Sequence, residues 1–411
     1  MEGKQKIQSL IPKEIFDSRG NPTIEVELKT SSFSVQASVP SGASVGRYEA
    51  MELRDGGKRH KGKGVFRAMK NIEKVIAPKL KGIDVTEQKK IDQLMIELDG
   101  TKNKSQLGGN AICAVSLAVC RAGAKSKNEQ LFEYIKEVSG MQLKLPISLF
   151  NIINGGAHAD NDLEFQEFMI APQKDIFSQN LKIGTEIYHQ LKDVLSKEYG
   201  EPGIILGDEG GFAPPLNSAQ EAIELILETA QILGYQDKIK IVLDVAASQF
   251  CQQGKYKMNT NIFATPQLTE YYSQLTSKYP ILGLEDPFSE NDWEGFAQIT
   301  KQLGQNILII GDDILVTNQE RIRKAQAKKA VNAMIVKINQ IGTVSEALEA
   351  VKLAKSFGLK TIVSHRSGET TDSFIADFAV GMGADFIKSG APGPKERMAK
   401  YNRLLEIEEK I

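Results

Sequence analysis

Six apolar runs in the second half of the chain each end in a polar or charged residue, with enough sequence between most of them for a helix. A parallel strand buried on both faces has this continuous apolar pattern, and in a (β/α) barrel the functional residues lie at the carboxyl ends of the strands. The pattern therefore predicts six barrel strands. They are Ile239–Asp244, Ile281–Glu285, Ile307–Asp312, Ala333–Lys337, Thr361–His365 and Asp385–Lys388.

The segments between these runs carry signals for helix ends. A serine or threonine three residues before a glutamate predicts a capping box at three helix starts, and Gly234 and Gly358 predict two helix ends. Barrels and doubly wound sheets share this order of elements, but a dinucleotide-binding sheet would need GxGxxG, which the sequence lacks. We therefore expect an α/β fold with a (β/α)8-type barrel. The three pairs are Ser218 with Glu221, Thr317 with Glu320, and Thr343 with Glu346.

The first part of the chain has a different pattern. Residues 24–28 and 34–39 alternate between apolar and polar positions, and the serines between them predict a hairpin turn. Three helical stretches follow, near residues 65–77, 86–98 and 109–125, before Gly140 and Pro146 interrupt the pattern. We predict a smaller α+β domain over residues 1–138 and a barrel domain over residues 139–411.

Composition narrows the class of protein. Lys and Arg total 51 against 52 for Asp and Glu, so charge favours neither nucleic acid nor an anionic membrane as the main partner. No segment approaches the roughly 18 consecutive apolar residues of a membrane span. The three cysteines form no CxxC pair, which argues against a zinc site or a disulfide framework. We expect a cytoplasmic metabolic protein; a cell-surface or secreted pool without a signal peptide stays open.

Three of the predicted strands end in acids, namely Asp244, Glu285 and Asp312. If these strands are neighbours, three carboxylates converge at the barrel mouth and suit Mg²⁺, which prefers oxygen ligands. The alternative to a Mg²⁺ site is that these are three solvated acids in loops. Because all three acids stand at successive strand ends, we favour the Mg²⁺ site. Asp286 and Asp313 lie next to two of these acids, and the strand pattern favours the first acid of each pair.

Lys337 follows the apolar run Met334–Val336, where burial and nearby cations would lower the pKa of a lysine. That environment suits a general base. A lysine that extends from the strand end into solvent is the alternative, and the acids on the preceding strands favour the base.

Basic and polar groups follow the last two runs. The loop 364–370 contains His365, Arg366 and Ser367, and Lys388 ends the last run. The Arg366 guanidinium is a planar group that can donate two hydrogen bonds at once. With the Ser367 hydroxyl and the Lys388 ammonium nearby, it suits a phosphate or a carboxylate. Structural salt bridges would explain each cation taken singly, but together they indicate an anionic substrate.

Several longer motifs are more specific and together resemble the enolase family over residues 11–408. The family's activity is the reversible dehydration of 2-phospho-D-glycerate to phosphoenolpyruvate in glycolysis and gluconeogenesis, catalysed by a hydro-lyase with Mg²⁺. The motifs are Asp17-Ser-Arg-Gly-Asn-Pro-Thr23, Ser41-Gly-Ala-Ser44, Gly207-Asp-Glu-Gly-Gly211, Val336-Lys-Ile-Asn-Gln-Ile-Gly342, Ser364-His-Arg-Ser-Gly-Glu-Thr370 and Lys388-Ser-Gly-Ala-Pro392.

The resemblance implies a role for each motif residue. Two Mg²⁺ ions are expected, the first on the acidic triad Asp244, Glu285 and Asp312 and the second held with the help of Ser44. Lys337 is expected to take the C2 proton, and Glu209 to protonate the departing C3 hydroxyl. The remaining substrate-binding or pocket residues implied are His158, Glu167, His365, Arg366, Ser367 and Lys388.

Family members are often homodimers, so the resemblance also implies a homodimer or a higher homo-oligomer. Glu406 stands where such dimers often have an arginine facing an acid that corresponds to Glu25. That contact would here join acid to acid.

Two other functions are weighed against this one. Another Mg²⁺-dependent acid dehydratase or racemase could use the same barrel, but the serine-containing segment 41–44 and Arg366-Ser367 favour a phosphorylated substrate. A non-catalytic binding or structural role on the same fold is disfavoured because every catalytic residue type is present, although a second role stays open.

Overall fold

The structure, a computed structural model, describes residues 5–42, 46 and 48–411; Ser44 lies outside the described residues. Two compact units are defined by their internal contacts. The N-terminal unit contains residues 1–144, 336–352 and 365–384, and the barrel unit contains residues 145–335, 353–364 and 385–411. Each unit is described by itself below.

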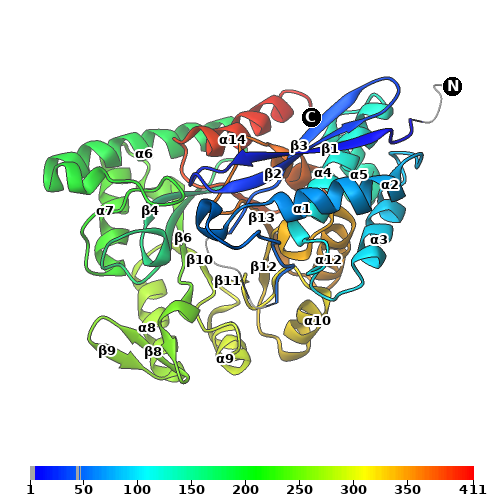
Figure 1. The fold of residues 1–411 in the computed structure, drawn as a ribbon. Helices are drawn as coiled ribbons and strands as arrows, with labels where there is room; N and C mark the ends of the chain where they lie inside the picture. Colours follow the sequence, from blue (N-terminus) through cyan, green and yellow to red (C-terminus); the bar gives the residue numbers. More distant parts are fainter. Residues whose placement is uncertain (1–4, 43–45, 47) are drawn as a thin grey trace. The chain divides into compact units, whose positions relative to one another are not determined.

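The N-terminal unit contains a three-stranded antiparallel sheet in the order β1-β2-β3, seen in Figure 1. Its strands are β1 (Ser9–Phe16), β2 (Pro22–Lys29) and β3 (Ser34–Ser38). Strands β2 and β3 form the predicted hairpin. Strand β1 was not predicted from the sequence, partly because it contains Pro12. A strand at the edge of a sheet tolerates proline.

Four helical stretches follow, of which the sequence predicts the first three. The first runs through α1 (Phe66–Asn71), a π-helical turn over Ile72–Ile76, and α2 (Ala77–Leu80). Helices α3 (Gln88–Asp99), α4 (Gly109–Ser126) and α5 (Leu131–Ser139) complete the set. Helix α4 is buried over most of its length because it packs against β2 and β3 (Figure 1).

A partly buried ion pair joins residues 365–384 to the rest of the N-terminal unit. Both oxygens of the Asp372 carboxylate accept hydrogen bonds of 2.7 Å from the Arg121 guanidinium on α4. They also accept the backbone N–H groups of Ser38 and Phe374, both at 2.8 Å. Burial raises the pKa of Asp372, but Arg121 and these amides outweigh it and hold that pKa below its usual value. Helices α11 (Ile338–Ile341) and α13 (Phe374–Gly381) belong to this unit. Helix α12 (Val344–Ser356) belongs to it as far as residue 352.

The barrel is a closed sheet of eight strands in the order β10-β11-β12-β13-β14-β4-β5-β6. Six of its strands coincide with the six apolar runs, within a residue at each end, and confirm the predicted barrel. They are β6 (Ile239–Asp244), β10 (Ile281–Glu285), β11 (Leu308–Gly311), β12 (Ala333–Val336), β13 (Lys360–Ser364) and β14 (Phe386–Lys388).

Two further strands close the barrel, β4 (Ile147–Asn154) and β5 (Glu167–Pro172). Strand β5 runs antiparallel to both of its neighbours, β4 and β6. Its amino-terminal residue, Glu167, therefore lies at the same end of the barrel as the carboxyl-terminal residue of β6, Asp244. Apolar side chains fill the interior, among them Leu149, Met169, Val242, Ile310, Ile335 and Ile362.

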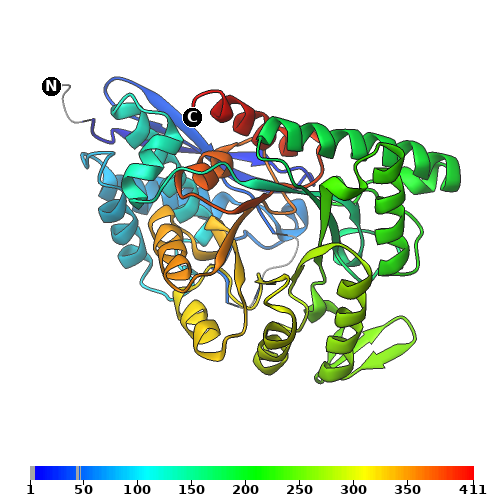
Figure 2. The ribbon, with the colours of Figure 1, turned by 180° about the vertical axis from the view of Figure 1, so that it is seen from behind.

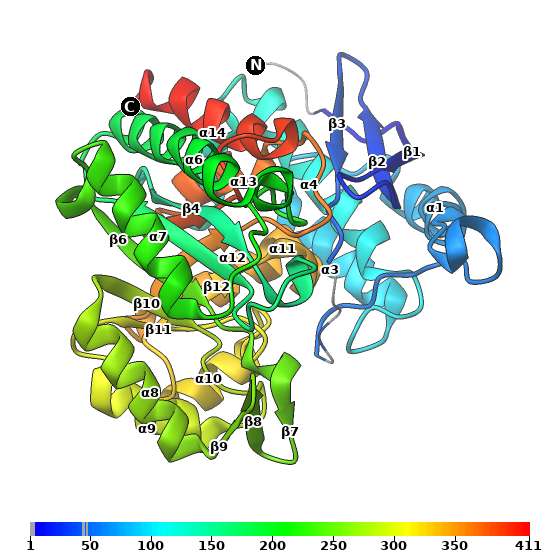
Figure 3. The ribbon, with the colours of Figure 1, turned by 90° about the vertical axis from the view of Figure 1, so that its left-hand side faces the viewer.

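Helices follow the strands of the barrel unit and lie outside the barrel, as Figures 1 and 3 show. Figure 2 shows α6 (Phe177–Tyr199), the longest of them, beside α14 (Lys395–Glu408), the last. Glu408 at the end of α14 accepts the N–H groups of Phe177 and Ser178 at the start of α6. A small sheet of β7 (Cys251–Gln252), β8 (Lys255–Met258) and β9 (Asn261–Phe263) lies next to α8 (Figure 3). The helices are α6 (Phe177–Tyr199), α7 (Ala219–Ile232), α8 (Thr265–Lys278), α9 (Trp293–Leu303), α10 (Gln319–Lys328) and α14 (Lys395–Glu408).

Two of the three predicted capping positions are confirmed and one is wrong. The hydroxyl of Ser218 accepts the Glu221 N–H at 3.3 Å, and that of Thr343 accepts the Glu346 N–H at 3.1 Å. Helix α10 is instead capped by Asn318, whose side chain accepts the N–H groups of Glu320 and Arg321. Thr317 adopts a left-handed backbone conformation with φ +54° and so does not cap α10.

Glycine ends two helices as predicted, with φ +69° at Gly234 and +77° at Gly358. Among the helices in the described part of the chain, none is long and apolar enough to cross a membrane.

Candidate active site

Three carboxylates form one rung across neighbouring barrel strands. Asp244 pairs in register with Glu167 on one side and with Glu285 on the other. All three side chains are buried, and Asp312 follows directly after β11, the next strand around the barrel. The register therefore brings predicted residues from β5, β6 and β10 to one end of the barrel.

Lys388 links this rung together from β14. Its Nζ lies 2.8 Å from both oxygens of Glu285, 3.2 Å from Oε2 of Glu167 and 3.5 Å from Oδ2 of Asp244. Burial lowers the pKa of Lys388, but these carboxylates outweigh burial and raise it well above its usual value. The lysine is therefore a fixed cation in this group of acids.

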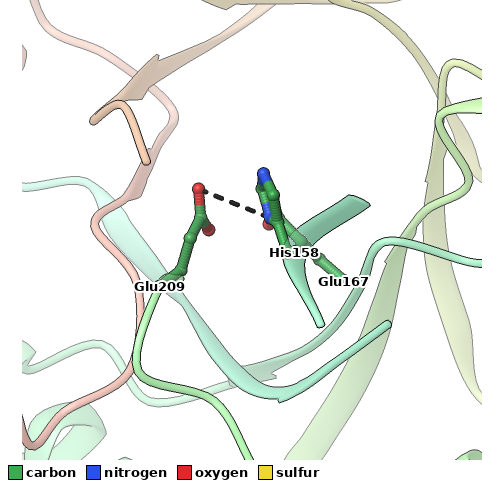
Figure 4. A group of neighbouring side chains, drawn as sticks. All are labelled: His158, Glu167 and Glu209. Carbon is green, nitrogen blue, oxygen red and sulfur yellow. Dashed lines mark ion pairs between the residues drawn. The ribbon is translucent and has the colours of Figure 1, made fainter. Parts of the chain in front are cut away.

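A second group, shown in Figure 4, consists of His158, Glu167 and Glu209. His158 ends a short 3₁₀ helix, Gly156–His158, and its Nδ1 lies 3.7 Å from Oε1 of Glu167 and 3.8 Å from Oε1 of Glu209. Oε2 of Glu209 accepts a 3.1 Å hydrogen bond from the Asn151 side-chain amide. The two glutamates thus approach the same imidazole nitrogen.

The backbone around Glu209 is closely constrained. Gly210 has φ +83°, and a Cβ at that position would lie 2.4 Å from Cγ of Pro394. The Glu209 carbonyl accepts the Ala391 N–H at 3.0 Å, which ties the 207–211 loop to the loop after β14. Glycine is therefore needed at residue 210 both for its conformation and for space.

Burial governs the protonation of the second group. Burial, reinforced by the charge of Glu209, raises the pKa of Glu167 well above its usual value. Burial also lowers the pKa of His158, although the neighbouring carboxylates oppose that effect. Since Glu167 and Glu209 lie against one imidazole, a proton held here belongs to the pair of acids.

The predicted residues after β12 and β13 belong to the N-terminal unit. Lys337 is half-buried and follows β12 directly. The Arg366 guanidinium is buried and donates to Oε2 of Glu49 at 3.0 Å and to Oδ1 of Asn339 at 3.1 Å. His365 and Ser367 are also buried.

The 365–370 loop contacts two other motifs within this unit. Ser41 and Gly368 exchange backbone hydrogen bonds of 2.8 and 2.9 Å, and the Ser18 N–H donates to the Glu369 carbonyl at 2.7 Å. Asp17 accepts the Ser41 hydroxyl at 2.7 Å. Motifs that are far apart in sequence are therefore neighbours here.

Three side chains at the site were not predicted. Asn151 holds Glu209, Gln166 donates to Oδ2 of Asp244 at 3.1 Å, and Asp286 accepts backbone N–H groups of the loop that carries Asp312. Burial, together with the charges of Asp313 and Asp312, raises the pKa of Asp286 well above its usual value. The sequence shows Asp286 only as the acid after Glu285, and no pattern marks the two amides.

The barrel and the acids at its mouth define the class of this protein as an α/β-barrel enzyme. The family model for the enolase C-terminal TIM barrel domain matches residues 142–411, and that for the enolase N-terminal domain matches residues 7–135. "Enolase" of Pyrococcus furiosus is 50% identical over 416 aligned residues, which cover 100% of this chain and 96% of the relative.

Two further relatives agree with these matches. "Enolase B" of Dictyostelium discoideum is 51% identical over 98% of this chain and 95% of the relative, and "Enolase" of Methanocaldococcus jannaschii is 48% identical over 100% and 97%. The chain belongs to the enolase family. Its activity is that of a phosphopyruvate hydratase, the lyase that interconverts 2-phospho-D-glycerate and phosphoenolpyruvate in glycolysis.

Proposed function

We propose that this chain performs its dehydration at the carboxyl end of the barrel, with Mg²⁺ held by Asp244, Glu285 and Asp312. The observation that carries the proposal is the register pairing of Asp244 with Glu285 on neighbouring strands, with Asp312 just past the next strand. Among the described residues, the group whose ligand atoms already lie close together is His158, Glu167 and Glu209. We prefer the triad because it offers only carboxylate oxygens, which Mg²⁺ favours over an imidazole nitrogen.

The charge of the site supports a resident cation. Glu167, Asp244 and Glu285 share one buried ammonium group, that of Lys388, which leaves an excess of negative charge. When bound, Mg²⁺ would supply positive charge opposite the negative charge that develops on the substrate carboxylate. We propose two ions for each site, the second held with the help of Ser44.

Two residues of the chain would move protons. Lys337 takes the proton from C2 of the substrate, and Glu209 donates a proton to the hydroxyl that leaves C3. Asn151 holds one oxygen of Glu209, and the other faces His158 (Figure 4). This role needs the proton that the pair of acids shares to lie on Glu209 with Glu167 charged, although burial raises the pKa of Glu167.

The remaining residues would bind the substrate anion. Arg366 and Ser367 suit the phosphate, and His158, His365 and Lys388 are proposed to bind the substrate as well. Arg366 is already held by Glu49 and Asn339, so its guanidinium is oriented before substrate binds. A preset orientation reduces the entropy lost on binding.

We also propose a cytoplasmic homodimer, with residues 1–138 as the smaller domain and residues 139–411 as the barrel domain. Glu406 is exposed, and its carboxylate pairs with Arg403 of its own helix at 2.8 Å. This pairing would weaken the repulsion expected between Glu406 and an acid such as Glu25 in a partner.

Asp312→Asn tests the metal assignment. The amide offers one neutral oxygen where the carboxylate offers a charge, so the Mg²⁺ concentration for half-maximal turnover is expected to rise at least tenfold. The measurement is turnover against Mg²⁺ concentration at saturating 2-phosphoglycerate. Asp385→Asn is the control, since Asp385 pairs with Lys360 at the opposite end of β13. An unchanged Mg²⁺ requirement in Asp312→Asn would refute the assignment.

A further inference from the structure

Asp286 is a buried acid whose two carboxylate oxygens both face the backbone of the neighbouring loop. Oδ1 accepts the Asp312 N–H at 3.0 Å, and Oδ2 accepts the Asp313 N–H at 2.8 Å. The carboxylate therefore fixes the backbone of Asp312 rather than serving as another open acid.

The backbone of Asp286 contacts the remaining parts of the acidic site. Its N–H donates to the Ile310 carbonyl on β11 at 3.0 Å, and its carbonyl accepts the Ala247 N–H at 3.1 Å. Ala247 lies three residues after Asp244, and Asp286 itself follows Glu285. One residue thus connects the segments that carry all three acids.

Backbone strain shows that Asp286 is held in place. Its φ is +40°, a left-handed conformation that is uncommon outside glycine, although aspartate adopts it more readily than most residues. Such a conformation persists where surrounding contacts determine it. The contacts available for this are the four hydrogen bonds described above.

The loop after Asp312 also needs an external support. Val316 and Thr317 are buried, β-branched and left-handed, with φ +44° and +54°. The Asp312 carbonyl accepts the Val316 N–H at 2.7 Å, so this strained turn begins at the acid itself. A loop of this kind would relax if the anchor at its first residues were lost.

We propose that Asp286 is a positioning residue for the three acids, because it fixes the backbone of Asp312 and is hydrogen-bonded to the segment that follows Asp244. The inference rests on the proposed Mg²⁺ site. Partners behind the ligands of a metal typically change its affinity by about 10-fold to 100-fold. The expected consequence is a loss of Mg²⁺ affinity larger than the loss of turnover at saturating Mg²⁺.

Asp286→Asn is the first test, because the amide keeps one acceptor and turns an NH₂ group toward a backbone N–H. Mg²⁺ affinity, measured by calorimetric titration of the folded protein without substrate, is expected to fall about 10-fold to 100-fold. Asp286→Glu keeps the charge but displaces both oxygens, and a similar loss is expected. Full Mg²⁺ affinity in Asp286→Glu would show that charge rather than position matters and would overturn the proposal.

Asp292→Asn is the matched control from the same segment between β10 and α9. The Asp292 carboxylate accepts the Gly295 N–H at 2.9 Å and the Tyr256 hydroxyl at 2.8 Å, and neither partner belongs to the acidic site. This variant is expected to lose thermal stability and to keep its Mg²⁺ affinity. Equal losses of stability in Asp286→Asn and Asp292→Asn, with unchanged Mg²⁺ affinity in both, would make Asp286 merely structural.

Asp312→Asn separates failure of this inference from failure of the proposed function. If Asp312→Asn weakens Mg²⁺ binding and the Asp286 variants do not, the metal site stands and Asp286 does not position it. If none of these variants changes Mg²⁺ affinity, the acidic triad is not the metal site, and both proposals are overturned.

Discussion

Replacement of Lys337 by alanine is expected to lower turnover by about 10⁴-fold, near the upper end of what general base catalysis contributes. The reason is that the proton on C2 is a very weak acid even beside a metal-bound carboxylate, and no water replaces a positioned amine efficiently. Mg²⁺ and 2-phosphoglycerate binding should persist because Lys337 is not one of the proposed metal ligands. Single-turnover kinetics and separate binding titrations measure the two effects.

Lys360→Ala is the control for this prediction. Lys360 begins β13 and pairs with Asp385 at 3.1 Å in an exposed position, at the end of the strand away from the site. Its loss should leave turnover unchanged, since exposed ion pairs contribute about 0–1 kcal/mol to stability. Near-normal turnover in Lys337→Ala would remove Lys337 as the base.

Replacement of Glu209 by glutamine is expected to lower net dehydration by about 10²-fold to 10³-fold. Glutamine keeps the size of the side chain and a hydrogen bond to Asn151, but it supplies no acidic proton to the hydroxyl that leaves C3. Removal of the C2 proton by Lys337 should continue. Exchange of the C2 hydrogen of 2-phosphoglycerate with deuterium from solvent, followed by NMR, is therefore expected to persist in Glu209→Gln and to vanish in Lys337→Ala.

Glu201→Gln provides the control, since Glu201 is an exposed acid just before the 207–211 loop. It should dehydrate and exchange like the unmodified protein. Loss of exchange in Glu209→Gln, with normal exchange in the control, would mean that Glu209 acts in proton removal rather than in departure of the hydroxyl.

The barrel could be predicted because six of its strands are buried on both faces and appear as plain apolar runs. Strands β1, β4 and β5 were not predicted, for different reasons. Pro12 interrupts β1, and Asn151 interrupts the apolar run of β4. Strand β5 begins with Glu167, which looks like one more acid of the preceding polar loop. At α10 the capping pattern was misleading because Asn318, one residue later, caps the helix better than a left-handed Thr317.

Residue types at the site were predictable, but their pairings were not. Strand ends placed Asp244 and Glu285 at the barrel mouth, while only the sheet register shows that they are direct neighbours. The contact of Lys388 with Glu285 and that of Arg366 with Glu49 join residues more than 100 positions apart. Such contacts depend on the closed barrel and on loop packing, which leave no local pattern in the sequence.

The central claim is that the acids at the barrel mouth hold the Mg²⁺ needed to dehydrate 2-phosphoglycerate. The most direct measurement is the rise in ultraviolet absorbance as phosphoenolpyruvate forms, recorded with Mg²⁺, with excess chelator, and again after Mg²⁺ is restored. We predict a rise that the chelator abolishes and that added Mg²⁺ recovers. A rate unaffected by the chelator, or no phosphoenolpyruvate from folded protein with Mg²⁺ in excess, would contradict the account.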